Sequence, residues 1–151
     1  GKQRPGALAD DYFHVVLGYG ALRVILHGSC LVSATMPRFV IHGSEGSFIK
    51  FGMDVQEEQL KLGLRPPAAN WGQDPEPGQL SRMVEGQPLV QAVSAEAGDY
   101  GAYYRGVCAA IRGEAGNPVP AVEALAVMAL LDLARESDSQ GRRLSCQKLS
   151  D

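Results

Sequence analysis

The stretch DDYFHVVLGYGALRVILHGSCLV, residues 10–32, decides the fold of this chain. Two runs rich in β-branched and aromatic residues, which favour strands, flank the segment Gly18-Tyr19-Gly20-Ala21. Because glycine adopts positive φ angles at little steric cost, this segment predicts a tight turn between strands at 11–17 and 22–32. The chain is therefore expected to begin with an antiparallel β-hairpin.

The rest of the sequence alternates strand and helix patterns. Further strands are predicted at 38–42, 47–51 and 89–95, with a short last strand at 142–146 and two turns of helix at 55–62. One longer helix is predicted to start at the N-cap Asp99 and end at Gly113, and another to run from Pro120 to about Arg135. Both helices carry apolar faces that we expect to be buried. The series indicates an α+β fold, an open-faced, mostly antiparallel sheet with helices packed on one face.

Length and composition indicate one domain, at residues 10–146, between a linker or frayed end at 1–9 and a tail at 147–151. The net charge of −3 and the scattered basic residues argue against a nucleic-acid partner. No apolar run is long enough for a membrane span. Three cysteines without a CxxC motif predict unpaired, mostly buried thiols, and we expect a cytoplasmic protein.

The hairpin places histidines on one face. With the turn centred on 19–20, His14 opposes Ile25 and His27 opposes Tyr12, so the two histidines are diagonal neighbours. Together with His42 they could hold zinc and form a zinc hydrolase. We favour a polar-aromatic interface instead, because the sequence places no carboxylate to orient the imidazoles. No metal ligand is therefore assigned.

Apolar side chains alternate along both predicted hairpin strands, so neither face of the hairpin is polar. A sheet covered by helices on one side normally leaves its other side in water. A second apolar face therefore predicts contact with another sheet, most simply in a homodimer or homotetramer. The residues expected on this oligomer face are Tyr12, His14, Ile25 and His27.

Five segments occur in a fixed order: DDYF at 10–13, LRV at 22–24, RFVIHGSEGSF at 38–48, DY at 99–100 and NPVP at 117–120. This series, spread over residues 10–146, resembles the C-terminal domain of the glucose–fructose oxidoreductase / inositol dehydrogenase (Gfo/Idh/MocA) family. The resemblance implies a parent enzyme in which a Rossmann domain, missing from this chain, binds NAD or NADP. Such enzymes oxidise or reduce sugars, inositols or related polyols, and their open sheet forms the oligomer.

The catalytic parts implied by the resemblance are absent here. The family's glycine fingerprint and its Glu-Lys-Pro segment with the catalytic lysine have no match, and Arg23 stands where Gly18-Tyr19-Gly20 would need a third glycine. We therefore assign no catalytic and no cofactor-binding residue, and expect the fragment alone to bind no cofactor and to be inactive. The alternative is a standalone, non-catalytic module that self-associates or binds a small ligand.

The loop at 59–80 is the predicted region of substrate contact. It holds four prolines and the only tryptophan, and long irregular loops in compact domains are often functional. Arg65, Trp71 and Gln73 combine hydrogen-bond donors with a stacking face, which suits a polyol. A simpler alternative is that Trp71 anchors the loop to the core or to a neighbouring subunit.

Overall fold

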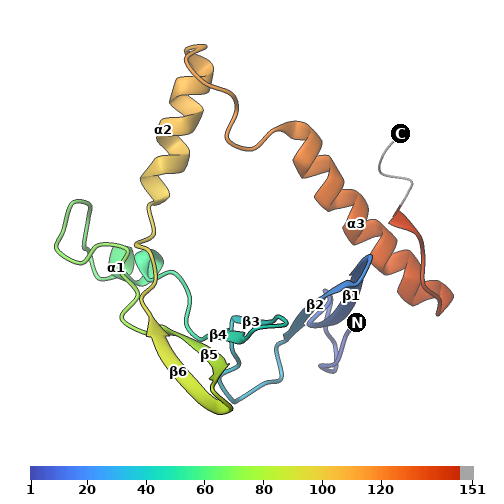
Figure 1. The fold of residues 1–151 in the computed structure, drawn as a ribbon. Helices are drawn as coiled ribbons and strands as arrows, with labels where there is room; N and C mark the ends of the chain where they lie inside the picture. The colour runs from blue at the N-terminus through green and yellow to red at the C-terminus, as the bar shows by residue number, and fades with distance from the viewer. Residues whose placement is uncertain (147–151) are drawn as a thin grey trace. The chain divides into compact units, whose positions relative to one another are not determined.

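The computed structural model describes residues 1–146 and shows an α+β fold with antiparallel sheets, as predicted (Figure 1). Its elements are β1 (Tyr12–Tyr19), β2 (Leu22–Ser29), β3 (Phe39–His42), β4 (Ser47–Lys50), α1 (Gln56–Lys61), β5 (Gly78–Val84), β6 (Gln87–Val93), α2 (Tyr100–Ile111) and α3 (Ala121–Gln140). Strands β1 and β2 form one sheet, and the other four form a second sheet in the order β3-β4-β5-β6.

The described chain divides into two compact units. One comprises Gly1–Ser33 and the chain from Ala109 onward, and the other comprises Ala34–Cys108. The region expected as one domain, 10–146, contains parts of both units, and the expected tail at 147–151 lies outside the described residues. In the segment expected as a linker, the backbone N–H groups of Gln3 and Arg4 bind the carboxylate of Asp11.

The hairpin forms as predicted, but its register differs. The turn lies at Gly20-Ala21, so His14 pairs with His27 and Val16 pairs with Ile25. The predicted pairing of His14 with Ile25 was wrong because the turn centre was placed one residue too early. That error moves each partner by two residues, which preserves the face because strand side chains alternate with a period of two. Tyr12, His14, Ile25 and His27 therefore do share one face of the hairpin.

The second sheet contains one strand that the sequence analysis missed. Strand β5, with the sequence GQLSRMV, pairs with β4 on one side and with β6 on the other. Its glycine, serine and arginine weaken the strand pattern, and it follows a proline-rich loop. The turn at Glu85-Gly86 connects β5 to β6, and the two strands form the twisted ribbon drawn in yellow-green in Figure 1.

The two long helices begin where predicted. The Asp99 carboxylate accepts a hydrogen bond from the Ala102 N–H at 3.1 Å, which confirms the N-cap of α2. Helix α3 continues to Gln140, beyond the predicted end, and stops at Gly141. The predicted last strand at 142–146 is wrong. The Arg142 N–H donates to the Ser137 carbonyl oxygen at 3.2 Å, and the Arg142 carbonyl oxygen accepts from Ser137 Oγ at 2.7 Å, so the backbone of Arg142 closes the end of α3.

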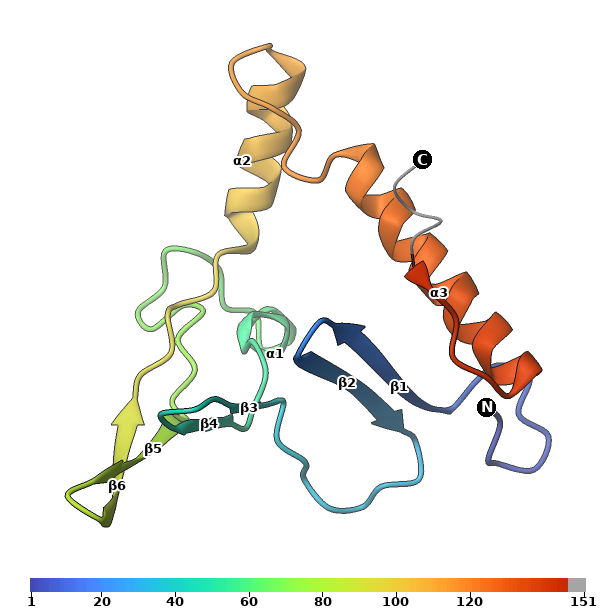
Figure 2. The ribbon, with the colours of Figure 1, turned by 45° about the vertical axis from the view of Figure 1, so that its right-hand side comes forward.

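Hydrophobic side chains are not buried in the part of the chain that the structure covers. Leu125 of α3 is 68% exposed and Ile111 of α2 is 81% exposed, so the predicted burial of both helices was wrong. Leu130 and Leu133 of α3 line a cavity of about 940 Å³ together with Val15 and Leu17 of β1, but the remaining helical faces are uncovered. Figure 2 shows α3 running along the side of β1 within their unit.

The three cysteines are unpaired as predicted, but all of them are exposed, so the expected burial was wrong. No helix within residues 1–146 is both long enough and apolar enough to cross a membrane.

Candidate functional site

The unit Ala34–Cys108 contains a cavity of about 690 Å³ beside α1. We call it the α1–loop cavity, because residues of α1, of the irregular loop at 62–77 and of the end of β6 line it. Its lining residues are Val55, Gln59, Asn70, Gln73, Asp74, Pro75, Pro77, Ala92 and Ser94. The predicted substrate loop therefore does border a cavity.

The side-chain amide of Gln59 holds one part of the loop against α1. Its Nε2 donates to the Asn70 carbonyl oxygen at 3.0 Å, and its Oε1 accepts from the Gly72 N–H at 2.8 Å. Both ends of this amide are therefore occupied within the protein. Gly72 also contacts Gly98, because the Gly98 N–H donates to the Gly72 carbonyl oxygen at 2.9 Å. The loop is fixed by these bonds although it has no regular secondary structure.

A second amide, that of Gln56, lies at the start of α1 and is completely buried. Its Oε1 accepts hydrogen bonds from the Trp71 indole Nε1 at 3.1 Å and from the Tyr100 N–H at 2.9 Å. Its Nε2 donates to the Asp54 carboxylate at 2.8 and 3.0 Å. One side chain thus connects α1, the loop and the start of α2, which fulfils the requirement that buried polar groups be hydrogen-bonded.

An ion pair fixes the far end of the loop. Lys50 Nζ lies 2.5 Å from Asp74 Oδ2, and these side chains are only 11% and 13% exposed. Lys50 Nζ also donates to the Phe51 carbonyl oxygen, and Asp74 Oδ1 accepts from the Glu76 N–H at 2.9 Å. The hydrogen bond from Lys50, followed by that from the Glu76 N–H, lowers the pKa of Asp74. The Asp74 carboxylate in the cavity wall is therefore ionised, and the Lys50 ammonium group already neutralises its charge.

The polar groups left for a ligand are neutral. Within residues 1–146, the side chains of Asn70, Gln73 and Ser94 make no hydrogen bond to the protein. Two amides and one hydroxyl can each donate and accept hydrogen bonds, which suits a partner rich in hydroxyl groups. The lining contains no arginine, lysine or histidine, so the cavity offers no cation to an anionic ligand.

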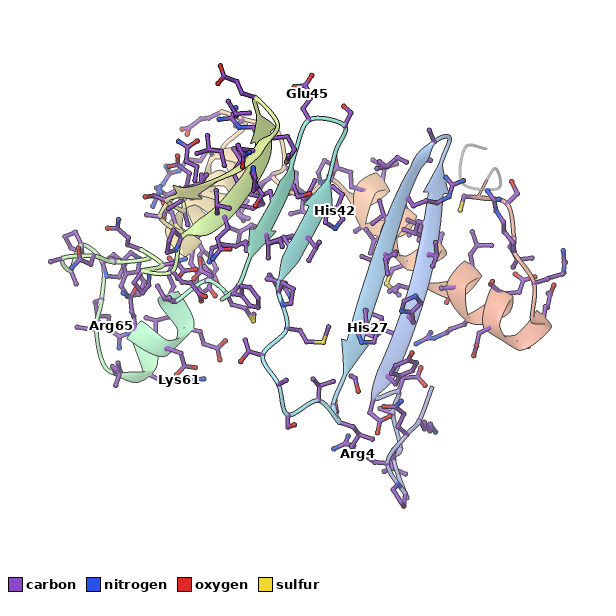
Figure 3. All side chains as sticks on the ribbon, turned by 60° about the horizontal axis from the view of Figure 1, so that its bottom comes forward. Arg4, His27, His42, Glu45, Lys61 and Arg65 are labelled. Carbon is purple, nitrogen blue, oxygen red and sulfur yellow. The ribbon has the colours of Figure 1, made fainter. Side chains whose placement is uncertain are left out.

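The three predicted substrate-loop residues have different positions. Gln73 lines the α1–loop cavity. The Trp71 N–H is bound to Gln56, as the anchoring alternative proposed. Arg65 lies exposed on the loop and does not line the cavity (Figure 3). Asn70 and Ser94 were not predicted from the sequence. An asparagine directly before the lone tryptophan is the signal that could have indicated Asn70, because asparagine tolerates the positive φ of 59° found there.

The histidines do not form a three-ligand cluster. No group of three or more histidine, cysteine, aspartate or glutamate residues is placed to hold a metal ion in the described part of the chain. His42 Nδ1 lies 2.8 Å from Ser47 Oγ on the neighbouring strand, in the other unit from His14 and His27. The structure therefore gives no support to the three-histidine zinc hydrolase considered from the sequence.

The open antiparallel sheets, followed by two long helices, define this chain as an open-sheet α+β domain. A family model described as "Oxidoreductase family, C-terminal alpha/beta domain" matches residues 1–146. The chain belongs to this Gfo/Idh/MocA oxidoreductase family and corresponds to its C-terminal domain. The resemblance found in the sequence is thereby confirmed.

Individual relatives agree with this assignment. The chain is 47% identical over 134 residues to the uncharacterized oxidoreductase YdgJ of Escherichia coli, covering 89% of the chain and 39% of the relative. It is 39% identical over 144 residues to the scyllo-inositol 2-dehydrogenase (NADP(+)) IolW of Bacillus subtilis, covering 94% of the chain and 40% of the relative. The solved structure of YPO2259 from Yersinia pestis matches with a TM-score of 0.89 and 44% identity, covering 95% of this chain and 41% of that one. The chain thus spans about 40% of the length of these relatives.

Proposed function

We propose that this chain is the substrate-binding and self-associating domain of an NAD(P)-dependent oxidoreductase that acts on an inositol, a sugar or a related polyol. The observation that carries the substrate class is the α1–loop cavity, whose one charged lining side chain, Asp74, is paired with Lys50 and whose unpaired polar groups are neutral. Family membership supports the reaction class, and a relative that is 39% identical is a scyllo-inositol 2-dehydrogenase (NADP(+)). The nicotinamide cofactor would be held by a separate Rossmann domain of the full-length protein.

The chemistry of the cavity favours a neutral polyol. A volume of about 690 Å³ can contain a small ligand, and Asn70, Gln73 and Ser94 present donors and acceptors that match several hydroxyl groups. An anionic sugar would bring a charge that no free cation of the lining compensates, which is costly in a partly closed site. The ion pair between Lys50 and Asp74 fixes the end of the loop beside the cavity, and its two charges cancel.

In the reaction, a hydride passes between a secondary alcohol carbon and the nicotinamide ring. The contribution of this chain is to bind and orient the substrate hydroxyls through Gln73 and Asn70, so that one carbon faces the cofactor. The buried amide of Gln56 and the amide of Gln59 keep the loop in place. We assign the proton transfer to residues outside this chain.

The second role, self-association, uses the hairpin face with Tyr12, His14, Ile25 and His27. Ile25 is 60% exposed and Val16, directly opposite on the same face, is 56% exposed. An apolar and aromatic sheet face left in water is typical of a protein interface. A second copy of the same face supplies a matching partner, because two-fold symmetric contacts pair a surface with itself.

The substrate role is tested by steady-state kinetics of the full-length enzyme with scyllo-inositol and NADP⁺ as probes. We expect turnover, and we expect Gln73→Ala to raise KM roughly tenfold with little change in kcat, since about 1.4 kcal/mol of hydrogen bonding is lost. The control is Gln79→Ala, an exposed amide on β5 that does not line the cavity. An unchanged KM in Gln73→Ala, or no turnover of any neutral polyol, contradicts the proposal.

Self-association is tested by inserting one charge on either face of β2. Ile25 and Leu22 are both 60% exposed but point to opposite faces of the hairpin. We expect Ile25→Asp to reduce the oligomer measured by sedimentation velocity and Leu22→Asp to leave it intact. Equal effects of both variants, or a monomeric parent protein, would refute the assignment of the hairpin face.

A further inference from the structure

We propose that His14 and His27 form a two-imidazole chelating site for a divalent transition-metal ion, with Zn²⁺ as the representative ligand. The two residues are direct partners across β1 and β2, near the middle of the hairpin. Their Nδ1 atoms lie 3.4 Å apart. Figure 3 shows His27 on the hairpin strand from which its ring extends. The inference is independent of the oxidoreductase assignment.

The separation of the two nitrogens is the first argument. Imidazole nitrogens bind zinc at about 2.0–2.1 Å, and two ligands of a tetrahedral ion at about 2.1 Å lie about 3.4 Å from each other. This is the Nδ1–Nδ1 distance in the protein. A hydrogen bond between the rings would instead favour about 2.9–3.0 Å. The observed 3.4 Å is at the long end of a hydrogen bond between the rings, and it equals the spacing of two ligands on one tetrahedral ion.

The arrangement of the rings is the second argument. The ring planes of His14 and His27 cross at 63° with their centroids 5.5 Å apart, so the rings are not stacked on each other. The Tyr12 ring makes a T-shaped contact with His27, with centroids 5.6 Å apart and ring planes at 78°. Both histidines are exposed in the single chain, so an ion can reach them without opening the fold whenever a second copy does not cover the hairpin face.

The surroundings select the kind of ion. No ion pair of the described chain involves His14 or His27, so neither ring is committed to a carboxylate. Imidazole ligands favour Zn²⁺, Cu²⁺ and Ni²⁺ over Mg²⁺ and Ca²⁺, which prefer oxygen. With two protein ligands, water completes the coordination sphere, and we expect weaker binding than at a three-ligand catalytic zinc site.

Metal binding would connect the two strands at their centre. A ligand that binds the folded hairpin and not the unfolded chain stabilises the folded state by mass action. Zn²⁺ should therefore raise the melting temperature of the protein and slow amide hydrogen exchange in β1 and β2. Exchange in the sheet β3–β6 should not change, because its histidine, His42, already contacts Ser47 and has no histidine partner across the strands.

The site is tested in the full-length protein, purified without a histidine tag, stripped of metal and diluted until sedimentation velocity shows the monomer, so that a second copy does not cover the hairpin face. Calorimetric titration with Zn²⁺ should show binding that His14→Gln or His27→Gln weakens at least tenfold, while the control His42→Gln binds as the parent does. Cu²⁺ electron paramagnetic resonance of the unaltered protein should show hyperfine coupling to two imidazole nitrogens. This spectrum keeps the proposal testable if a variant fails to fold.

Three results overturn the site. They are the absence of Zn²⁺ binding at concentrations up to about 1 mM, where two-ligand sites should be occupied, affinity that is unchanged in both His14→Gln and His27→Gln, and a Cu²⁺ spectrum without two nitrogen ligands. None of these results bears on polyol oxidation, and because the monomer is titrated they do not depend on self-association through Ile25 either. Failure of the metal site and failure of the proposed function can therefore be told apart.

Discussion

The side-chain carbonyl of Gln56 accepts a hydrogen bond from the indole Nε1 of Trp71 at 3.1 Å, and Gln56 is completely buried. The lone tryptophan of the chain is therefore tied to the first turn of α1. The same oxygen accepts from the Tyr100 N–H, so one atom orders two segments that are far apart in sequence. Trp71 lies between Asn70 and Gln73, two residues that line the α1–loop cavity.

We expect Gln56→Leu to loosen the loop at 62–77. The substitution leaves the Trp71 and Tyr100 donors without an acceptor, and each buried unpaired group costs about 1–3 kcal/mol. Hydrogen exchange of the loop should accelerate and the melting temperature should fall. Gln79→Leu, at an exposed position of β5, serves as the control and should have little effect. Equal protection of the loop in Gln56→Leu and the parent would argue against the connecting role.

We expect Gly72→Ala to be more damaging than Gly63→Ala. Both glycines have positive φ, at +70° and +80°, so both substitutions carry a similar backbone cost of about 1–2 kcal/mol. A Cβ at Gly72 would lie 2.1 Å from the Gly98 carbonyl oxygen, whereas nothing lies within 4 Å of one at Gly63. Thermal denaturation of the two variants separates the backbone cost, which both share, from the steric clash with Gly98, which only Gly72→Ala has. Identical melting temperatures would mean that the contact between Gly72 and Gly98 does not constrain the loop.

We expect Lys50→Met to destabilise the loop by about 2 kcal/mol, because the Asp74 carboxylate loses its charged hydrogen-bond partner. The folded-state pKa of Asp74 is lowered by Lys50, so this contribution is present above the pKa of unfolded aspartate and is lost on acidification. The double variant Lys50→Met/Asp74→Leu removes both charges and should recover part of the loss. If the loss of unfolding free energy in the double variant, measured by urea denaturation, equals the sum of the losses in Lys50→Met and Asp74→Leu, the two side chains do not interact.

We expect Asp11 to make the stability of its unit sensitive to acid. The Gln3 N–H at 2.6 Å, and then the Arg4 side chain at 2.9 Å, lower the pKa of Asp11 to about 2. The unfolded pKa of aspartate is about 3.9. A lowered folded pKa means that the stabilisation is complete above about 4 and disappears as the pH falls toward 2.

Asp11→Asn removes this charge, so the difference in melting temperature between the parent and the variant should be largest near neutral pH and shrink toward pH 3. Asp10→Asn, at the neighbouring residue whose side chain is 54% exposed, should give a small difference at every pH. A difference that stays constant from pH 7 to pH 3 would contradict the role assigned to the Asp11 carboxylate.

Much of the local structure was predictable from the sequence. The hairpin, the helix start at Asp99 and the ordered segments of the family depend on residues close to one another in the chain. Strand periodicity also placed Tyr12, His14, Ile25 and His27 on one face even though the register was wrong, because an error of two residues preserves the face. Strand β5 escaped prediction because its glycine, serine and arginine suppress the local pattern.

The candidate site was predictable only in outline. The proline-rich loop and Gln73 were visible in the sequence, since loop composition is a local property. The lining of the cavity by Asn70 and Ser94, and the bond between Gln56 and Tyr100 across 44 positions, were not visible. The sequence by itself determined the family, the hairpin, the two long helices and the face of the hairpin residues. Tertiary structure alone decided the register, the cavity and which apolar faces remain open, because these depend on groups brought together by long-range packing and hydrogen bonding.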